Sequence, residues 1–155
     1  MGFQVVPLEA EKFSDLYGLD NETLARRGVE RHTVQEKPGY PCRVSLVDCE
    51  VGETVLLLNY EHQPANTPYR SSHAIFVRDG AETAVIEKDT VPELMRIRTL
   101  SVRAFDGKGA MADAAVVDGE KLTDLIQRMF DNEEVEYLHV HNADRGCFDA
   151  TIIRA

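Results

Sequence analysis

Helical spacing of apolar residues is confined to a few segments of the chain. The strongest pattern predicts a helix over Gly119 to Asp131, because one apolar stripe recurs there at helical spacing: Leu122, Leu125, Ile126, Met129 and Phe130. A weaker pattern predicts a second helix over Glu9 to Tyr17. Asp20 is the expected N-cap of a third helix that ends by Arg27, and Pro92 to Met95 indicates a short fourth one.

Most of the remaining chain alternates polar and apolar residues or holds short apolar runs, which is typical of strands. The run Val55 to Leu58, inside the segment Glu53 to Tyr60, predicts a central strand that is buried on both faces. Asp79-Gly80 is a two-residue hairpin signal between residues 74–78 and 82–87. Two prolines predict a loop over Glu61 to Ser72. The other expected strands are residues 3–6, 29–36, 43–47, 97–105, 110–117, 136–141 and 148–153.

These patterns together predict a single α+β domain over residues 1–155. Antiparallel hairpins outnumber helices, so we expect a largely antiparallel or mixed β-sheet with a few helices packed on it. The length suits one domain with its own core. Hydrophobic residues make up 43% of the chain, as in an ordinary globular protein.

The net charge of the chain limits the classes of partner that we expect it to bind. Seventeen Lys and Arg against 27 Asp and Glu give a net charge of −10, which repels nucleic-acid phosphates and anionic membranes. We therefore expect no nucleic-acid partner and no membrane partner, while a homodimer stays open. The sequence has no bilayer-length apolar run, no signal-peptide pattern and only three cysteines. A reduced, cytoplasmic location is the expectation.

The segment Tyr137 to Asn142 is the strongest candidate for chemistry. Residues two apart on a strand point to the same face, so His139 and His141 lie together while Leu138 and Val140 point into the core. Two imidazoles about 7 Å apart along a strand can share a metal ion, or act as a base and its orienting group. A solvent-facing strand that happens to carry histidine accounts for the pattern about as well.

Two other segments add candidates to the same site. Tyr60 and His62 lie where an apolar strand enters the proline-braced loop, and His62 is a candidate acid, base or metal ligand. Cys42 stands beside Arg43 and is a candidate nucleophile if the guanidinium lowers the pKa of the thiol. The ordinary alternatives are a surface loop for His62 and a buried, inert thiol for Cys42.

Cations near turns suggest an anion-binding spot in this acidic chain. If their loops meet, Arg43, Arg70 and Arg145, together with Asn142 and Tyr60, are expected to bind a carboxylate or phosphate group. Each arginine could equally be a solvated surface side chain. The sequence holds no Walker or dinucleotide glycine loop, no Cys-x-x-Cys pair and no Gly-x-Ser-x-Gly elbow, so these chemistries are not supported.

Several of these segments also carry a resemblance to a known family. Residues 38–43, 56–64, 68–70, 75–78 and 138–142 look like the hallmark segments of a bacterial family catalogued as domain of unknown function 1203. The resemblance implies a stand-alone bacterial domain and supplies no activity. His139-Val140-His141 is also similar to the start of the motif of histidine-triad nucleotide hydrolases. Ala143 stands in place of the third histidine, so that activity is not carried over.

The residues leave three hypotheses open. The first is a domain that binds or acts on a small anionic molecule in a pocket lined by Cys42, His62, His139 and His141. The second is a non-catalytic interaction or structural domain, in which the histidines make ordinary hydrogen bonds. The third is an enzyme in which His139 and His141 hold a divalent metal, with His62 as the partner to look for first.

Overall fold

The computed structural model describes residues 2–155 and divides them into two compact units. The first, here called the five-stranded unit, consists of residues 2–6, Glu61–His73 and Ile86–Ala155. The second, the three-stranded unit, consists of Pro7–Tyr60 and Ala74–Val85. Two paired strands, β3 (Thr54–Gln63) and β4 (Ser71–Arg78), run through both, so the tip of this hairpin belongs to the five-stranded unit.

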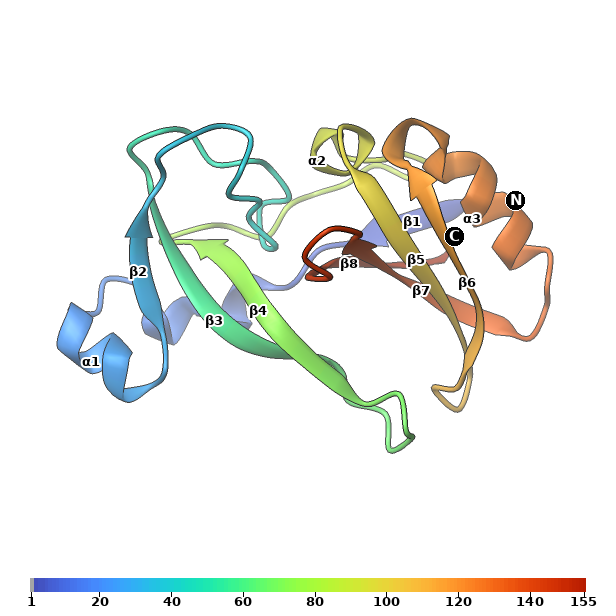
Figure 1. Cartoon of the computed structure of the whole chain (residues 1–155), viewed down its shortest axis with the longest axis horizontal. Coiled ribbons are helices and arrows are strands. Elements are labelled where there is room, and N and C mark those ends of the chain that lie inside the picture. Colours follow the sequence, from blue (N-terminus) through green and yellow to red (C-terminus); the bar gives the residue numbers. More distant parts are fainter. Residues whose placement is uncertain (1) are drawn as a thin grey trace. The chain divides into compact units, whose positions relative to one another are not determined.

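The five-stranded unit is built on an antiparallel sheet with the strand order β1-β8-β7-β5-β6 (Figure 1). Its strands are β1 (Phe3–Val6), β5 (Thr99–Asp106), β6 (Met111–Asp118), β7 (Val135–Asn142) and β8 (Phe148–Arg154). A short helix α2 (Glu93–Arg96) precedes β5. The 3₁₀ turn η3 (Gly119–Lys121) leads from β6 into helix α3 (Leu122–Phe130).

One face of this sheet forms the core of the unit. Strand alternation sends Leu100, Val102 and Ala104 of β5 to the same side as Leu138 and Val140 of β7, and all five are fully buried. Helix α3 packs against β6 and β7 with the apolar stripe that the sequence predicted. Burying one side chain of this kind contributes about 1.5–3 kcal/mol to folding.

The opposite face of the sheet is covered by the hairpin tip, residues 61–73. Gln63 Nε2 donates a hydrogen bond of 2.9 Å to Tyr137 Oη on β7. Thr67 Oγ1 donates one of 3.1 Å to the Gly109 carbonyl in the β5–β6 turn. The two bonds fix the tip over the sheet at separate points, so residues of the hairpin can share a site with residues of β7.

The three-stranded unit holds the sheet β2-β3-β4, in which β2 (Glu30–Thr33) pairs antiparallel with β3. Helix α1 (Asn21–Arg26) begins after Asp20, whose carboxylate accepts the Thr23 N–H at 2.8 Å. This confirms the predicted N-cap. Two 3₁₀ turns, η1 (Ala10–Lys12) and η2 (Ser14–Leu16), precede that helix.

The α+β class and most of the predicted elements are confirmed, but two predictions in the three-stranded unit are wrong. The helix predicted over Glu9 to Tyr17 is replaced by the two 3₁₀ turns, because Phe13 departs from helical geometry at φ −126° and separates them. Residues 43–47 form a turn instead of a strand. Leu46 there takes a left-handed φ of 51° and donates its N–H to the Cys42 carbonyl.

Two further differences concern the hairpins. Asp79-Gly80 turns the chain as predicted, but no strand follows over 82–87, because Ala84 N–H bonds to the Val44 carbonyl and Val85 is 95% exposed. The loop predicted over 61–72 is shorter, since β3 continues to Gln63 and β4 begins at Ser71. His62 therefore lies on a strand.

The single domain over residues 1–155 stays a prediction. Within residues 2–155, no helix combines the length and the apolar character that crossing a bilayer requires.

Candidate metal centre

Strand β7 presents two histidines on the polar face of the five-stranded sheet. His139 stands directly across from Arg103 of β5, and His141 stands across from Ser101. On the other side of β7, a bulge in the pairing with β8 brings Phe148 opposite His141. Bulges re-aim side chains and are frequent beside functional sites. Both histidines are buried, at 4% and 1% exposure.

His62 reaches the same face from the end of β3. Its ring stacks on the Phe148 ring, with centroids 5.3 Å apart and planes 5° apart. The next residue, Gln63, is held by its hydrogen bond to Tyr137. His62 is 8% exposed. The strand extension and these two contacts together place its imidazole against the pair on β7.

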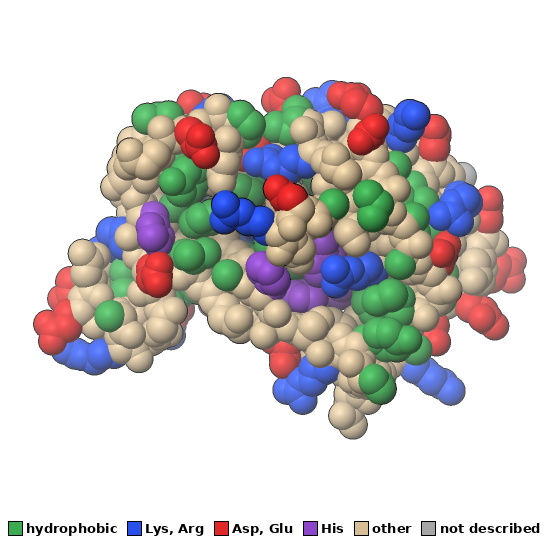
Figure 2. Space-filling model, viewed as in Figure 1, with side chains coloured by type: hydrophobic (Ala, Val, Ile, Leu, Met, Phe, Trp, Pro, Cys, Tyr) green, Lys and Arg blue, Asp and Glu red, His purple; other side chains and the backbone are tan. Residues whose placement is uncertain are grey.

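The three imidazoles form one compact cluster. The His62 ring centroid lies 4.8 Å from that of His141 and 6.0 Å from that of His139, and the two β7 rings are 6.4 Å apart. One ring nitrogen from each residue lies within 4.8 Å of the other two. Figure 2 shows several histidine side chains gathered together, with a basic side chain beside them.

This spacing is close to what a metal ion needs. A tetrahedral zinc ion at about 2.0–2.1 Å from each nitrogen holds its ligand atoms about 3.3 Å apart. The widest separation in the cluster exceeds that by about 1.5 Å at most, a change that rotation of imidazole rings can supply. The three residues therefore could hold a metal ion.

The hydrogen bonds of the cluster leave one buried ring nitrogen of each histidine without a partner. The Gly146 carbonyl lies 2.8 Å from His141 Nδ1. A carbonyl oxygen can only accept, so Nδ1 carries the proton and Nε2 keeps its lone pair. Within residues 2–155, His141 Nε2, His62 Nδ1 and His139 Nδ1 are buried with no hydrogen-bond partner. The cluster thus gathers three buried nitrogens that nothing in the fold satisfies.

Burial keeps these imidazoles neutral. Desolvation is the main cause that lowers the pKa of His62 to about 4 and that of His139 to about 3. It also lowers the pKa of His141 to about 3, against an opposing effect of the Gly146 carbonyl. The positive charge of Arg103 adds to the lowering at all three rings. At neutral pH each ring is therefore in the form that binds metals.

Comparison with known proteins identifies the family of the chain. The model of the family described as "Protein of unknown function (DUF1203)" matches residues 39–154, which is most of the chain. The chain belongs to the DUF1203 family. The match confirms the resemblance seen in the sequence, and it includes every residue of the histidine cluster. No curated protein and no solved structure matches the chain.

The site of this DUF1203 chain includes a residue that the sequence reasoning missed. Arg103 is half-buried on β5, directly across from His139, and its charge acts on all three histidines. The sequence pattern placed Arg103 with Ser101 on one polar face of a predicted strand. No signal in the sequence showed that β5 would pair with β7, because β6 and α3 lie between them along the chain.

Other predicted site residues of the five-stranded unit have partners outside the cluster. Arg70 Nε pairs with Glu61 Oε2 at 2.9 Å, and both side chains are exposed. Arg145 is exposed, and its carbonyl lies 3.1 Å from His73 Nε2. Asn142 is buried on the core side of β7, and its Nδ2 donates to Cys147 Sγ at 3.2 Å. Their ligand-binding roles stay predictions.

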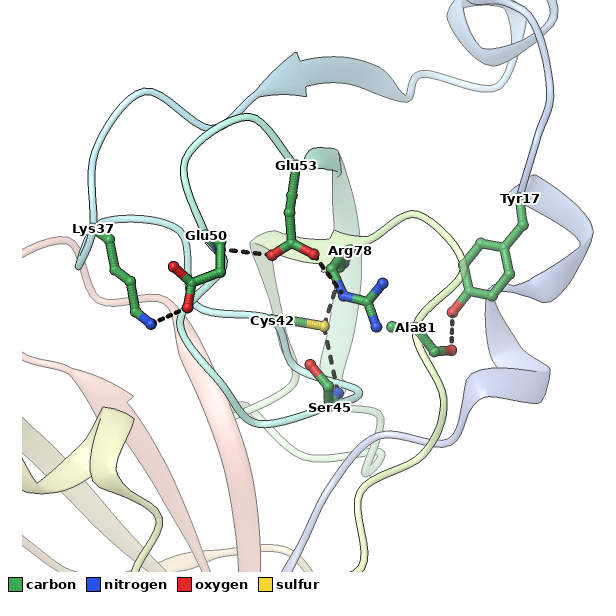
Figure 3. A network of polar contacts seen from close by, with 8 residues as sticks. All are labelled: Tyr17, Lys37, Cys42, Ser45, Glu50, Glu53, Arg78 and Ala81. Atoms are coloured by element: carbon green, nitrogen blue, oxygen red, sulfur yellow. Dashed lines mark hydrogen bonds and ion pairs between the residues drawn. The ribbon is translucent and has the colours of Figure 1, made fainter.

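The remaining predicted residues belong to the three-stranded unit. Figure 3 shows the Cys42 sulfur accepting backbone N–H groups from Ser45 and Arg78, at 3.4 and 3.3 Å. This thiol is fully buried and acts there as a hydrogen-bond acceptor. Arg43 is also buried and donates to the Pro41 carbonyl at 2.6 Å. Tyr60 is half-buried.

Proposed function

We propose that the function of this protein depends on a divalent transition-metal ion bound by His62, His139 and His141. Zinc is the ion whose preferences these residues fit best, because it takes neutral imidazoles as ligands and favours small coordination numbers. The proposal is carried by one observation: three buried histidines, each with an unpartnered ring nitrogen, bring one ring nitrogen apiece within 4.8 Å of the other two.

The cost of that arrangement supports the proposal. A buried polar atom left without a partner costs about 1–3 kcal/mol, so chance rarely places three together. A metal ion would give a partner to each ring nitrogen that coordinates it. The Gly146 carbonyl on His141 Nδ1 is the kind of outer contact that fixes the tautomer and orientation of a metal-bound histidine.

The number of ligands bears on the role of the ion. Structural zinc sites are usually closed by four protein ligands, whereas catalytic sites keep three and leave a position open. Within residues 2–155, no Cys, Asp or Glu joins the three histidines in the cluster. Zinc bound in this way supplies a Lewis acid and lowers the pKa of a bound water to about 7. The site is therefore of the kind that supports metal-assisted chemistry.

Metal content and affinity test the proposal directly. Protein purified without a histidine tag is stripped with a chelator and titrated with zinc by calorimetry, with elemental analysis of the dialysed product. We expect one zinc ion per chain. Substoichiometric binding of zinc, together with the same result for cobalt, nickel, copper and iron, would overturn the proposal, whatever the variants do.

Matched variants locate the ion. His139→Gln and His141→Gln each remove a nitrogen ligand and are expected to abolish stoichiometric binding. His32→Gln is the control, because His32 is exposed on β2 and its ring hydrogen-bonds to Glu30. Circular dichroism checks that each variant is folded. Full metal binding by folded His139→Gln and His141→Gln would place the ion elsewhere.

A further inference from the structure

Arg103 differs from the other half-buried arginines of the five-stranded unit. Its side chain is half-buried, and within residues 2–155 its guanidinium has no hydrogen-bond or ion-pair partner. By contrast, Arg98 and Arg154, which are also half-buried, donate to backbone carbonyls. Partly buried guanidinium groups are normally paired. Desolvation lowers the pKa of Arg103, which reflects the same unpaired burial.

The charge around a bound ion would be strongly positive. Three neutral imidazoles leave both charges of a divalent ion uncompensated, and Arg103 adds a third positive charge on the same face of the sheet. Within residues 2–155, no Asp or Glu joins the three histidines in the cluster, so no carboxylate ligand would offset this charge. An anion from solution is the simplest way to balance it.

The strand register places Arg103 next to the cluster. Directly opposed residues on antiparallel strands have Cβ atoms about 5 Å apart, and Arg103 opposes His139 in this way. A planar guanidinium binds two oxygens of a carboxylate or phosphate side by side. A small oxyanion can therefore place one oxygen on the ion and present the others to Arg103.

We propose that the metal centre takes a small oxyanion, a carboxylate or a phosphate, as its ligand or substrate, with Arg103 binding the oxygens that the ion leaves free. The proposal rests on the proposed metal site. It also moves the anion-binding role that the sequence suggested for Arg43, Arg70 and Arg145 onto a different arginine.

Cobalt-substituted protein separates the two proposals. Cobalt(II) in a three-histidine site absorbs visible light, and the spectrum reports both its binding and any change in its remaining ligand. Acetate and inorganic phosphate are titrated separately at constant ionic strength. We expect a saturable spectral change with at least one of them, and the tighter of the two identifies the oxyanion class. Absence of the cobalt spectrum means that the metal proposal has failed; a cobalt spectrum that neither anion alters overturns the oxyanion proposal alone.

Two charge-matched variants test the role of Arg103. Arg103→Gln is expected to keep the cobalt spectrum and to weaken anion binding by about tenfold or more. Arg128→Gln removes one positive charge from the same unit, where Arg128 pairs with Asp113 at 3.1 Å, and is expected to bind anions like the wild type. Arg103→Lys keeps the charge but loses the planar fork, so its anion affinity should lie between those of Arg103→Gln and the wild type. Equal anion affinity in wild type and in the folded Arg103 variants would remove Arg103 from the site.

Discussion

The buried histidines make the stability of the metal-free protein depend steeply on pH. His62, His139 and His141 have folded-state pKa values of about 4, 3 and 3, below the ordinary value of 6.5. The unfolded chain therefore binds more protons than the folded chain between these values. Stability is fully present above about pH 6.5 and is lost progressively as the pH falls towards the folded-state values.

The magnitude follows from linkage. At about pH 5, a histidine with these two pKa values has lost about 2 kcal/mol of stability relative to neutral pH, and the three together about 6 kcal/mol. A typical domain has about 5–15 kcal/mol in total. Mild acid should therefore bring the metal-free protein close to unfolding.

Urea unfolding of chelator-treated protein at a series of pH values measures this loss. Between pH 6 and pH 5, the slope of the unfolding free energy against pH should correspond to the uptake of about three protons on unfolding. His139→Gln should reduce the loss at pH 5 by about 2 kcal/mol. A slope of less than one proton in the wild type would show that the imidazoles are not buried and neutral.

Two predictions concern the framework that positions the site. Gly119→Ala should destabilise the protein by about 3 kcal/mol or more in urea unfolding, because the added Cβ would lie 1.9 Å from the Met95 carbonyl oxygen. Gly107→Ala is the control and should be nearly neutral, because its added Cβ meets only a flexible side chain. Equal destabilisation by the two substitutions would contradict this account of the close approach at Gly119. Asp20→Ala removes the acceptor of the Thr23 N–H and should cost about 1 kcal/mol, and an unchanged urea midpoint would show that the cap contributes nothing.

Local patterns in the sequence were sufficient for much of the fold and part of the site. The stripe of α3 and the N-cap of α1 depend on residues a few positions apart, and both were predicted correctly. The shared face of His139 and His141 follows from the same kind of local rule. Such features need no knowledge of which strands pair.

The rest of the site depends on long-range pairing, which the sequence does not display. His62 was expected near the β7 pair, but on a proline-braced loop; pairing with β4 extends β3 past the expected boundary and places His62 on the strand. Arg103 was missed because its role appears only when β5 lies beside β7. The ion pair between Arg70 and Glu61 also depends on how the hairpin folds, and nothing in the sequence indicated it.

The histidine cluster should lower the stability of the metal-free fold. Each unpartnered nitrogen and each desolvated imidazole is a cost of folding, and an apolar side chain of similar shape at the same position avoids it. His62 is the clearest case, because its ring already stacks on Phe148 in the manner of an aromatic core residue. His62→Phe keeps the stacked ring and removes the buried nitrogen.

In chelator at neutral pH, His62→Phe should therefore be as stable as the wild type or up to about 2 kcal/mol more stable by urea unfolding. With zinc present at about 1,000 times its dissociation constant, the wild type should gain about 4 kcal/mol from binding and the variant none, so the order of stability should reverse. A His62→Phe variant that loses more than about 2 kcal/mol in chelator would show that His62 is retained for packing. A reversal would show that the histidine is retained for the ion at the expense of the fold.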